Sequence, residues 1–199
     1  MALQRQSKIL TPAQEKAVLH YISEKRNAIR NRVIFLLSAK AGLRAKEIAS
    51  LTWEMVVDAN GEVGDCLHLT NTASKGKNGG RVIALHSLLK AALKELLARQ
   101  RKQYSFSFSS SVIMTERSRS TSPQVIVNTF SRWYGELSFV GCSSHSGRRT
   151  FITNAAKKIS AVGGSLRDVQ YLAGHSSLHT TQRYIEADSE AKKNVIRLL

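Results

Sequence analysis

The stretch SLRDVQYLAGHSSLHTTQRYI, residues 165–185, carries the signals of two short helices with a break between them. Ser165 and Asp168 have the spacing of a capping box, which predicts a helix over 166–173. Gly174 follows that helix, and a second helix is predicted over 177–184. The rest of the chain also predicts more helices than strands.

A helix start is predicted near the N-terminus, at Thr11, Pro12 and Gln14. Thr11 is expected to be the N-cap, Pro12 fits the first helical position, and Gln14 completes a capping box. A similar signal at 121–124 leads into a helix over 125–137. Apolar spacing predicts the remaining helices at 30–41, 45–51, 87–101, 145–159 and 189–198.

Two apolar segments, 66–69 and 81–85, predict strands on either side of a polar, glycine-rich turn at 74–80. A third short strand is predicted at 111–114, within a serine-rich segment. We find no internal repeat and no long linker. The sequence therefore predicts a mainly α fold with a small antiparallel β-sheet (α+β), formed by one domain over residues 1–199.

The charge indicates the partner. The chain has 199 residues and a net charge of +16, and the basic excess is equal in residues 1–100 and in the remainder. Such a spread suits a long polyanion such as nucleic acid, although a basic protein without this partner is an alternative. No apolar run approaches the ~20 residues of a membrane span, and residues 1–8 do not contain the apolar stretch that is expected of a signal peptide. Cys66 and Cys142 match neither a disulfide framework nor a zinc site, so a cytoplasmic location is expected.

Two clusters could bind an anion. Arg44 lies at a helix junction with Glu47 three residues later, a spacing that lets the carboxylate orient the guanidinium. His145 and Arg148 share one face of the first turn of a helix, where the N-terminus also attracts anions. Taken alone, the first cluster is more typical of an exposed salt bridge at a helix start, and the second is as typical of a solvated basic turn as of an anion site.

Three further positions add reactive groups: His175, Tyr184, and Lys75 in the predicted hairpin turn. Alone, Tyr184 is compatible with a half-buried core tyrosine, His175 with a capping residue, and Lys75 with a solvated lysine. Together with the arginines they supply what phosphoryl transfer through a covalent intermediate needs. Arginines bind non-bridging phosphate oxygens, tyrosine offers a nucleophile, and lysine can protonate a leaving oxygen.

Three strings in this order resemble the active-site motifs of the tyrosine recombinases, the phage integrase family. They are GLRAKEIASL at 42–51, HSGRRTF at 145–151 and LAGHSSLHTTQRYI at 172–185. The resemblance implies the catalytic-domain fold of that family and a reaction on double-stranded DNA. The reaction implied is site-specific recombination, as integration, excision or inversion, by strand cleavage and rejoining.

The resemblance also implies a role for each residue. Tyr184 would attack a scissile phosphate and form a 3′-phosphotyrosyl link, while Arg44 and Arg148 hold the phosphate. His175 would donate a further hydrogen bond, and Glu47 would orient Arg44.

Proton transfer in this family implies roles for two more residues. Lys75 would be the general acid for the 5′-oxygen, although Lys77 lies on the same predicted turn, and His145 would assist proton transfer at the tyrosine. Because cationic side chains stabilise the charge, no cofactor and no metal are expected.

The expected assembly is a homo-tetramer on two DNA duplexes that is monomeric when free, with accessory DNA-bending proteins as further partners. In this family a terminal helix, here 189–198, often docks on the next subunit; docking on its own core is the alternative. The separate helical DNA-clamping domain that usually precedes the catalytic domain is not expected in this chain. A short natural recombinase and a fragment of a longer integrase both agree with this.

Two other functions compete. A type IB topoisomerase shares the tyrosine chemistry but relaxes DNA without choosing a site, and the Gly-His-Ser-Ser string fits integrases better. A non-catalytic DNA-binding decoy would be expected to have lost one of the reactive residues, and all of them are present here.

Overall fold

The computed structural model describes residues 6–74, 80–186 and 196–197. The chain is mainly helical, and its two strands form an antiparallel hairpin in which Cys66 pairs with Ala84 and Leu69 with Arg81. This confirms the predicted fold class. The elements in chain order are α1 (Pro12–Ser23), α2 (Ala28–Ala41), α3 (Ala45–Ala49), η1 (Trp53–Met55), β1 (Cys66–Leu69), β2 (Arg81–Ala84), α4 (Ser87–Gln100), α5 (Pro123–Glu136), α6 (Ser146–Lys158), η2 (Ile159–Val162), α7 (Leu166–Ala173) and α8 (Leu178–Glu186).

The predicted helix starts are where the sequence puts them. The Thr11 hydroxyl accepts from the backbone N–H of Gln14 (3.2 Å), and the Gln14 side chain accepts from the N–H of Thr11 (2.9 Å). Ser165 and Asp168 form the same reciprocal cap at α7. These caps satisfy backbone donors that have no partner within the helix.

Two predicted segments differ from the structure, and a third cannot be compared with it. The helix predicted to reach residue 51 ends at Ala49, and the chain then turns through η1. The strand predicted at 111–114 is reduced to one bridge, between Ser111 and Thr52, which is flanked by the bond from the Val112 N–H to the carbonyl of Leu51 and by the bond from the Trp53 N–H to the carbonyl of Ser110. The helix predicted at 189–198 lies outside the described residues except for 196–197.

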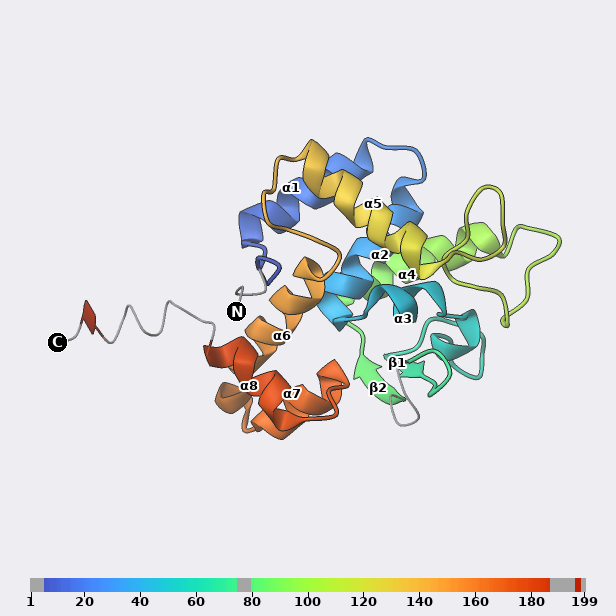
Figure 1. Ribbon diagram of the computed structural model, residues 1–199. Helices are drawn as coiled ribbons and strands as arrows, with labels where there is room; N and C mark the ends of the chain where they lie inside the picture. Colours follow the sequence, from blue (N-terminus) through green and yellow to red (C-terminus); the bar gives the residue numbers. More distant parts are fainter. Residues whose placement is uncertain (1–5, 75–79, 187–195, 198–199) are drawn as a thin grey trace.

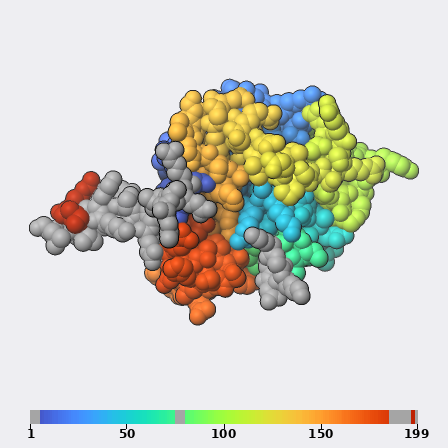
Figure 2. Space-filling view, in the orientation of Figure 1, coloured from blue at the N-terminus to red at the C-terminus, as the bar shows by residue number. Residues whose placement is uncertain are grey.

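Helix α2 is the centre of the larger hydrophobic core. Its residues from Val33 to Leu37 are all buried, and it packs against α1, α4 and α6. A smaller core, built on Ile152, Val169 and Ala173, joins α6, α7 and α8. Figure 1 shows α7 and α8 together at one end of the molecule beside α6, and the hairpin below α3. Figure 2 shows the residues of α7 and α8, in red, together at the same end of the molecular surface.

No helix within the described ranges is both long enough and apolar enough to cross a membrane.

Candidate active site

Arg44 stands at the start of α3, held by the carboxylate of Glu47. Its backbone N–H donates to Glu47 Oε2 (2.7 Å), and its Nη1 donates to Glu47 Oε1 (3.0 Å). A quarter of the Arg44 side chain remains exposed, whereas Glu47 is fully buried. The predicted contact between these two residues is therefore present, and it leaves one side of the guanidinium open to solvent.

Arg148 comes from the first turn of α6 and is buried. Its Nη1 donates to the carbonyl of Gly42 and its Nη2 to the carbonyl of Ala173, both at 2.5 Å. Close packing of α6 on α2 sets this position: a Cβ on Gly147 would lie 2.6 Å from the Ser38 hydroxyl. Arg148 thus links the loop before Arg44 to the end of α7.

The carbonyls of residues 172–174, at the C-terminal end of α7, each accept from a different arginine. Arg81 Nε donates to the first (2.9 Å), Arg148 to the second, and Arg44 Nη2 to the third (3.1 Å). The last carbonyls of a helix have no partner within it, and they carry the negative end of the helix dipole. This helix end therefore gathers three guanidinium groups in one place.

Arg81 is the member of this group that the sequence analysis did not select. It begins β2, is buried, and donates through Nη1 to Glu47 Oε1 (2.9 Å) and through Nη2 to Glu47 Oε2 (3.2 Å). The alternation of β2, in which Arg81 and Ile83 face inward, could have indicated it, because an arginine at an inward strand position needs a buried partner.

The charges of this cluster affect one another. Burial on its own would raise the pKa of Glu47, but the hydrogen bonds and charges of Arg81 and Arg44 lower the pKa below its usual range. Burial, followed by the nearby charge of Arg44, lowers the pKa of Arg148 to about 9. Three guanidinium groups therefore lie around one carboxylate, and Arg44 and Arg81 are the two that donate to it.

His175 follows α7 directly and contacts the nucleophile predicted by the sequence. Its Nδ1 lies 3.0 Å from the hydroxyl of Thr181, and its ring stacks on that of Tyr184 with centroids 5.5 Å apart. Burial, together with the charges of Arg148 and Arg44, lowers the pKa of His175 to about 4. His175 is therefore neutral at pH 7, and its Nε2 remains available as a donor or acceptor according to its tautomer.

Tyr184, His145 and Arg148 line a common hollow of about 330 Å³. His145 keeps contact with solvent, but partial loss of hydration and the charges of Arg148 and Arg44 lower its pKa. The hollow is also lined by residues that the sequence analysis did not select: Gln6, Ser7, Arg149, Thr180 and Arg183. It therefore places a neutral imidazole, a guanidinium and a phenol around one space.

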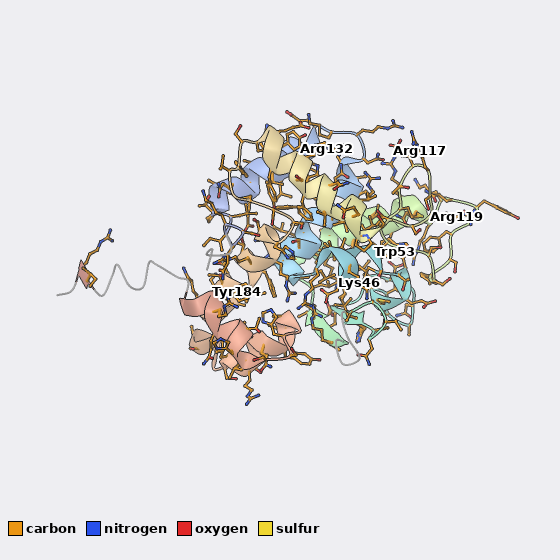
Figure 3. The ribbon with its side chains drawn as sticks, in the orientation of Figure 1. Lys46, Trp53, Arg117, Arg119, Arg132 and Tyr184 are labelled. Atoms are coloured by element: carbon orange, nitrogen blue, oxygen red, sulfur yellow. The ribbon has the colours of Figure 1, made fainter. Side chains whose placement is uncertain are left out.

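Lys75 and Lys77 lie outside the described residues, so only the ends of their segment can be placed. On one side, Lys46 Nζ donates to the carbonyl of Ser74 (3.1 Å); Lys46 is labelled on α3 in Figure 3. On the other side, the N–H of Gly80 donates to Asn71 Oδ1 (2.8 Å). Within the described part of the chain, no three His, Cys, Asp or Glu residues are grouped to hold a metal ion.

The chain is similar to known proteins over most of its length. The model of the phage integrase family matches residues 8–191. The TnP I resolvase of Bacillus thuringiensis is 31% identical over 185 residues, covering 92% of this chain and 59% of the resolvase. Tyrosine recombinase XerA of Pyrococcus furiosus is 29% identical over 189 residues, covering 95% of this chain and 60% of that protein. The chain therefore spans about three fifths of the length of these relatives.

Solved structures share the fold. A crystal structure of XerA recombinase aligns with a TM-score of 0.72 at 19% identity, covering 97% of this chain and 65% of that chain. The Tn1549 transposon integrase in complex with transposon right-end DNA aligns with a TM-score of 0.69 at 20% identity, covering 96% and 65%. At this level of identity the two structures support the fold alone.

Proposed function

Because the chain belongs to the phage integrase family, we propose that it is a site-specific DNA recombinase that forms a 3′-phosphotyrosyl intermediate at Tyr184. The observation that carries this proposal is the convergence of Arg44 and Arg148 at the end of α7, beside a hollow that Tyr184 and His145 line. A cluster whose arginines exceed its carboxylate attracts an anion, and a phosphodiester is an anion that two guanidinium groups can bind together.

In the cleavage step, the Tyr184 oxygen attacks the scissile phosphorus. A bond forms between the tyrosine oxygen and the 3′-phosphate, and the bond from phosphorus to the 5′-oxygen breaks. Arg44 and Arg148 stabilise the charge that develops on the non-bridging oxygens, and His175 donates a further hydrogen bond to them. Both arginines already donate to fixed carbonyls, so little reorganisation is needed when the phosphate arrives.

Two proton transfers complete this step. The phenol proton of Tyr184 passes to His145, whose lowered pKa leaves the ring neutral and able to accept it. Lys75 protonates the departing 5′-oxygen. In the rejoining step, a 5′-hydroxyl attacks the phosphotyrosyl bond and Tyr184 leaves, so the energy of the phosphodiester is conserved without a nucleotide cofactor.

We propose double-stranded DNA as the substrate and a homo-tetramer on two duplexes as the working assembly. Exposed basic side chains support this partner: Lys46, Arg117, Arg119 and Arg132, which Figure 3 labels on α3, on the loop before α5 and on α5 itself. With a net charge of +16, the chain is suited to neutralise phosphates over a surface much larger than the site.

The test is to trap covalent adducts. Wild type and Tyr184→Phe are incubated with a pool of nicked duplexes that includes DNA flanking the gene, and SDS-resistant complexes are recovered and sequenced. Tyr104→Phe, at a fully exposed tyrosine, is the matched control. We expect adducts with wild type and the control, none with Tyr184→Phe, and enrichment of one DNA motif.

The other outcomes separate the competing functions. Adducts without sequence preference would indicate relaxation of the type IB topoisomerase kind. Binding without any adduct from the wild-type protein would indicate a non-catalytic DNA-binding protein and would refute the proposal.

A further inference from the structure

We propose that Arg81 is a positioning residue for strand cleavage, which holds Glu47 and the end of α7 so that Arg44 keeps both its place and its charge for the phosphate. This inference rests on the proposed function. Arg81 is not among the residues that the family resemblance selected, and its contacts give it this role.

Arg81 is not placed to contact the scissile phosphate itself. Only 2% of its side chain is exposed, against 25% for Arg44, and, unlike the buried Arg148, it does not line the hollow beside Tyr184. Its effect on a bound phosphate must therefore pass through the groups that it holds, which are the carboxylate of Glu47 and the carbonyl of Leu172.

Arg81 and Arg44 share both oxygens of one carboxylate. Oε1 of Glu47 accepts from Arg44 Nη1 (3.0 Å) and Arg81 Nη1 (2.9 Å). Oε2 accepts from the backbone N–H of Arg44 (2.7 Å) and from Arg81 Nη2 (3.2 Å). The two-point contact with Arg81 fixes the rotation of the carboxylate, and therefore the direction in which the carboxylate holds Arg44.

The charges of Arg44, Arg81 and Glu47 also support a positioning role for Arg81. If Arg44 were the only partner of a fully buried Glu47, the carboxylate would cancel most of the charge that Arg44 could offer to a phosphate. Arg81 supplies a second, buried positive charge that balances Glu47. Arg44 then keeps one face, and a positive charge, for the substrate.

The chain also makes room for Arg81 at the end of α7. Gly174 adopts φ +58°, and a Cβ there would lie 2.7 Å from Arg81 Nη1. Glycine at this position thus serves both the left-handed turn and the close approach of the guanidinium. Arg81 consequently joins β2 to α3 and to the turn that leads into His175.

The test compares two scissile groups in the duplex recovered by adduct trapping. One carries an ordinary phosphodiester, and the other a methylphosphonate, which lacks one negative oxygen and so depends less on arginine charge. Single-turnover cleavage is measured for wild type, Arg81→Met, Arg81→Lys and Arg44→Ala. Gln100→Met is the matched control, because buried Gln100, the last residue of α4, also takes part in two side-chain hydrogen bonds, with Trp53 and with the carbonyl of Val112.

We expect Arg81→Met to cleave the phosphodiester about 10- to 100-fold more slowly than wild type, a smaller loss than for Arg44→Ala. On the methylphosphonate, the loss of cleavage rate in Arg81→Met should be several-fold smaller than on the phosphodiester, and the same should hold for Arg44→Ala. Arg81→Lys should recover part of the cleavage rate on the phosphodiester. Gln100→Met should change both substrates equally. If the Arg81 variants lose the same factor in cleavage rate on both substrates, Arg81 has only a structural role and the inference is overturned. If Arg81→Met fails to fold, the same comparison is made with Arg81→Lys.

A second measurement does not need DNA cleavage. Arginine Nε–H NMR signals of the free protein are compared between wild type and Arg81→Lys, and the Arg44 signal is assigned from its absence in Arg44→Ala. A shifted or broadened Arg44 signal in Arg81→Lys is expected, and an unchanged signal would contradict the inference. Failure of wild type to cleave, combined with a shifted signal, would instead refute the proposed function alone.

Discussion

The arginines of this protein fall into two groups that differ in what holds them. The inner arginines donate to Glu47 or to the carbonyls at the end of α7, and they are Arg44, Arg81 and Arg148. The outer arginines are exposed on α5 and on the loop before it, and they are Arg117, Arg119 and Arg132. One protein therefore uses the same side chain in two physical settings.

This difference in burial predicts different roles for the two groups of arginines, one in the rate of cleavage and the other in the affinity for DNA. Burying a guanidinium costs hydration, so a buried arginine is retained only where fixed acceptors surround it, and its charge is then precisely oriented in a poorly screened place. An exposed arginine costs little to place, and salt screens its charge. We therefore expect the inner arginines to govern cleavage and the outer ones to govern DNA binding.

The largest expected effect within this comparison is that of Arg148→Ala. Loss of a fixed donor to the transition state should slow single-turnover cleavage about 10²- to 10³-fold, with less than a threefold change in DNA affinity. Cleavage is measured with protein in excess over a nicked duplex, and affinity by gel shift. Arg132→Ala is the matched control, and a similar loss of rate in both variants would abolish the distinction between the two groups.

The next largest effect is expected for the general acid, and it decides whether Lys75 or Lys77 has that role. Removing the general acid should slow cleavage about 10²-fold or more. The defect should largely disappear when the 5′-oxygen is replaced by sulfur, because a thiolate leaves without a proton. We expect this pattern for Lys75→Ala and not for Lys77→Ala. Sulfur rescue of Lys77→Ala alone would move the assignment to Lys77.

A smaller effect should appear when two outer arginines are removed together. Arg117→Ala combined with Arg119→Ala should weaken binding and should reduce the slope of log K against log salt by about 2, since each phosphate contact contributes about 0.9. The cleavage rate of the fully bound complex should not change. Gel shifts at several salt concentrations measure the slope, and an unaltered slope would show that these arginines do not touch DNA.

The smallest effect is one of pH on stability. His175 binds a proton only near pH 4 when folded, but near its ordinary pKa of 6.5 when unfolded. Between these values the unfolded chain binds more protons, so the free energy of unfolding should fall as the pH falls from about 6.5 to 4 and should be unaffected by His175 above 6.5. Urea unfolding of His175→Gln should show a weaker dependence over this window, whereas His179→Gln, at an exposed position, should follow wild type.

Much of this arrangement could be predicted from local signals. The capping residues Thr11 and Ser165 fix helix starts through bonds that span three residues, and the contact of Glu47 with Arg44 spans the same distance. Interactions between residues three positions apart can be predicted from the spacing of the residue types in the sequence. The predicted fold class is confirmed, whereas the catalytic roles of Arg44, Arg148 and His175 stay predictions.

Other features depend on contacts between distant segments. Arg81 meets Leu172 across 91 residues, and no local pattern states which carbonyl a buried arginine will reach. The segment 111–114 has the composition of a strand, but it finds only Thr52 as a bridge partner. In both cases tertiary packing decides, because a strand or a buried charge requires a partner that its own neighbours in the sequence cannot supply.

The most direct test of the account is to identify the residue that joins protein to DNA. The SDS-resistant adduct is digested with protease and nuclease, and the modified peptide is sequenced by mass spectrometry. The account predicts a nucleotide 3′-phosphate on Tyr184 and a free 5′-hydroxyl on the released strand. Attachment at any other side chain, or a 5′-phosphate on the peptide, would contradict it.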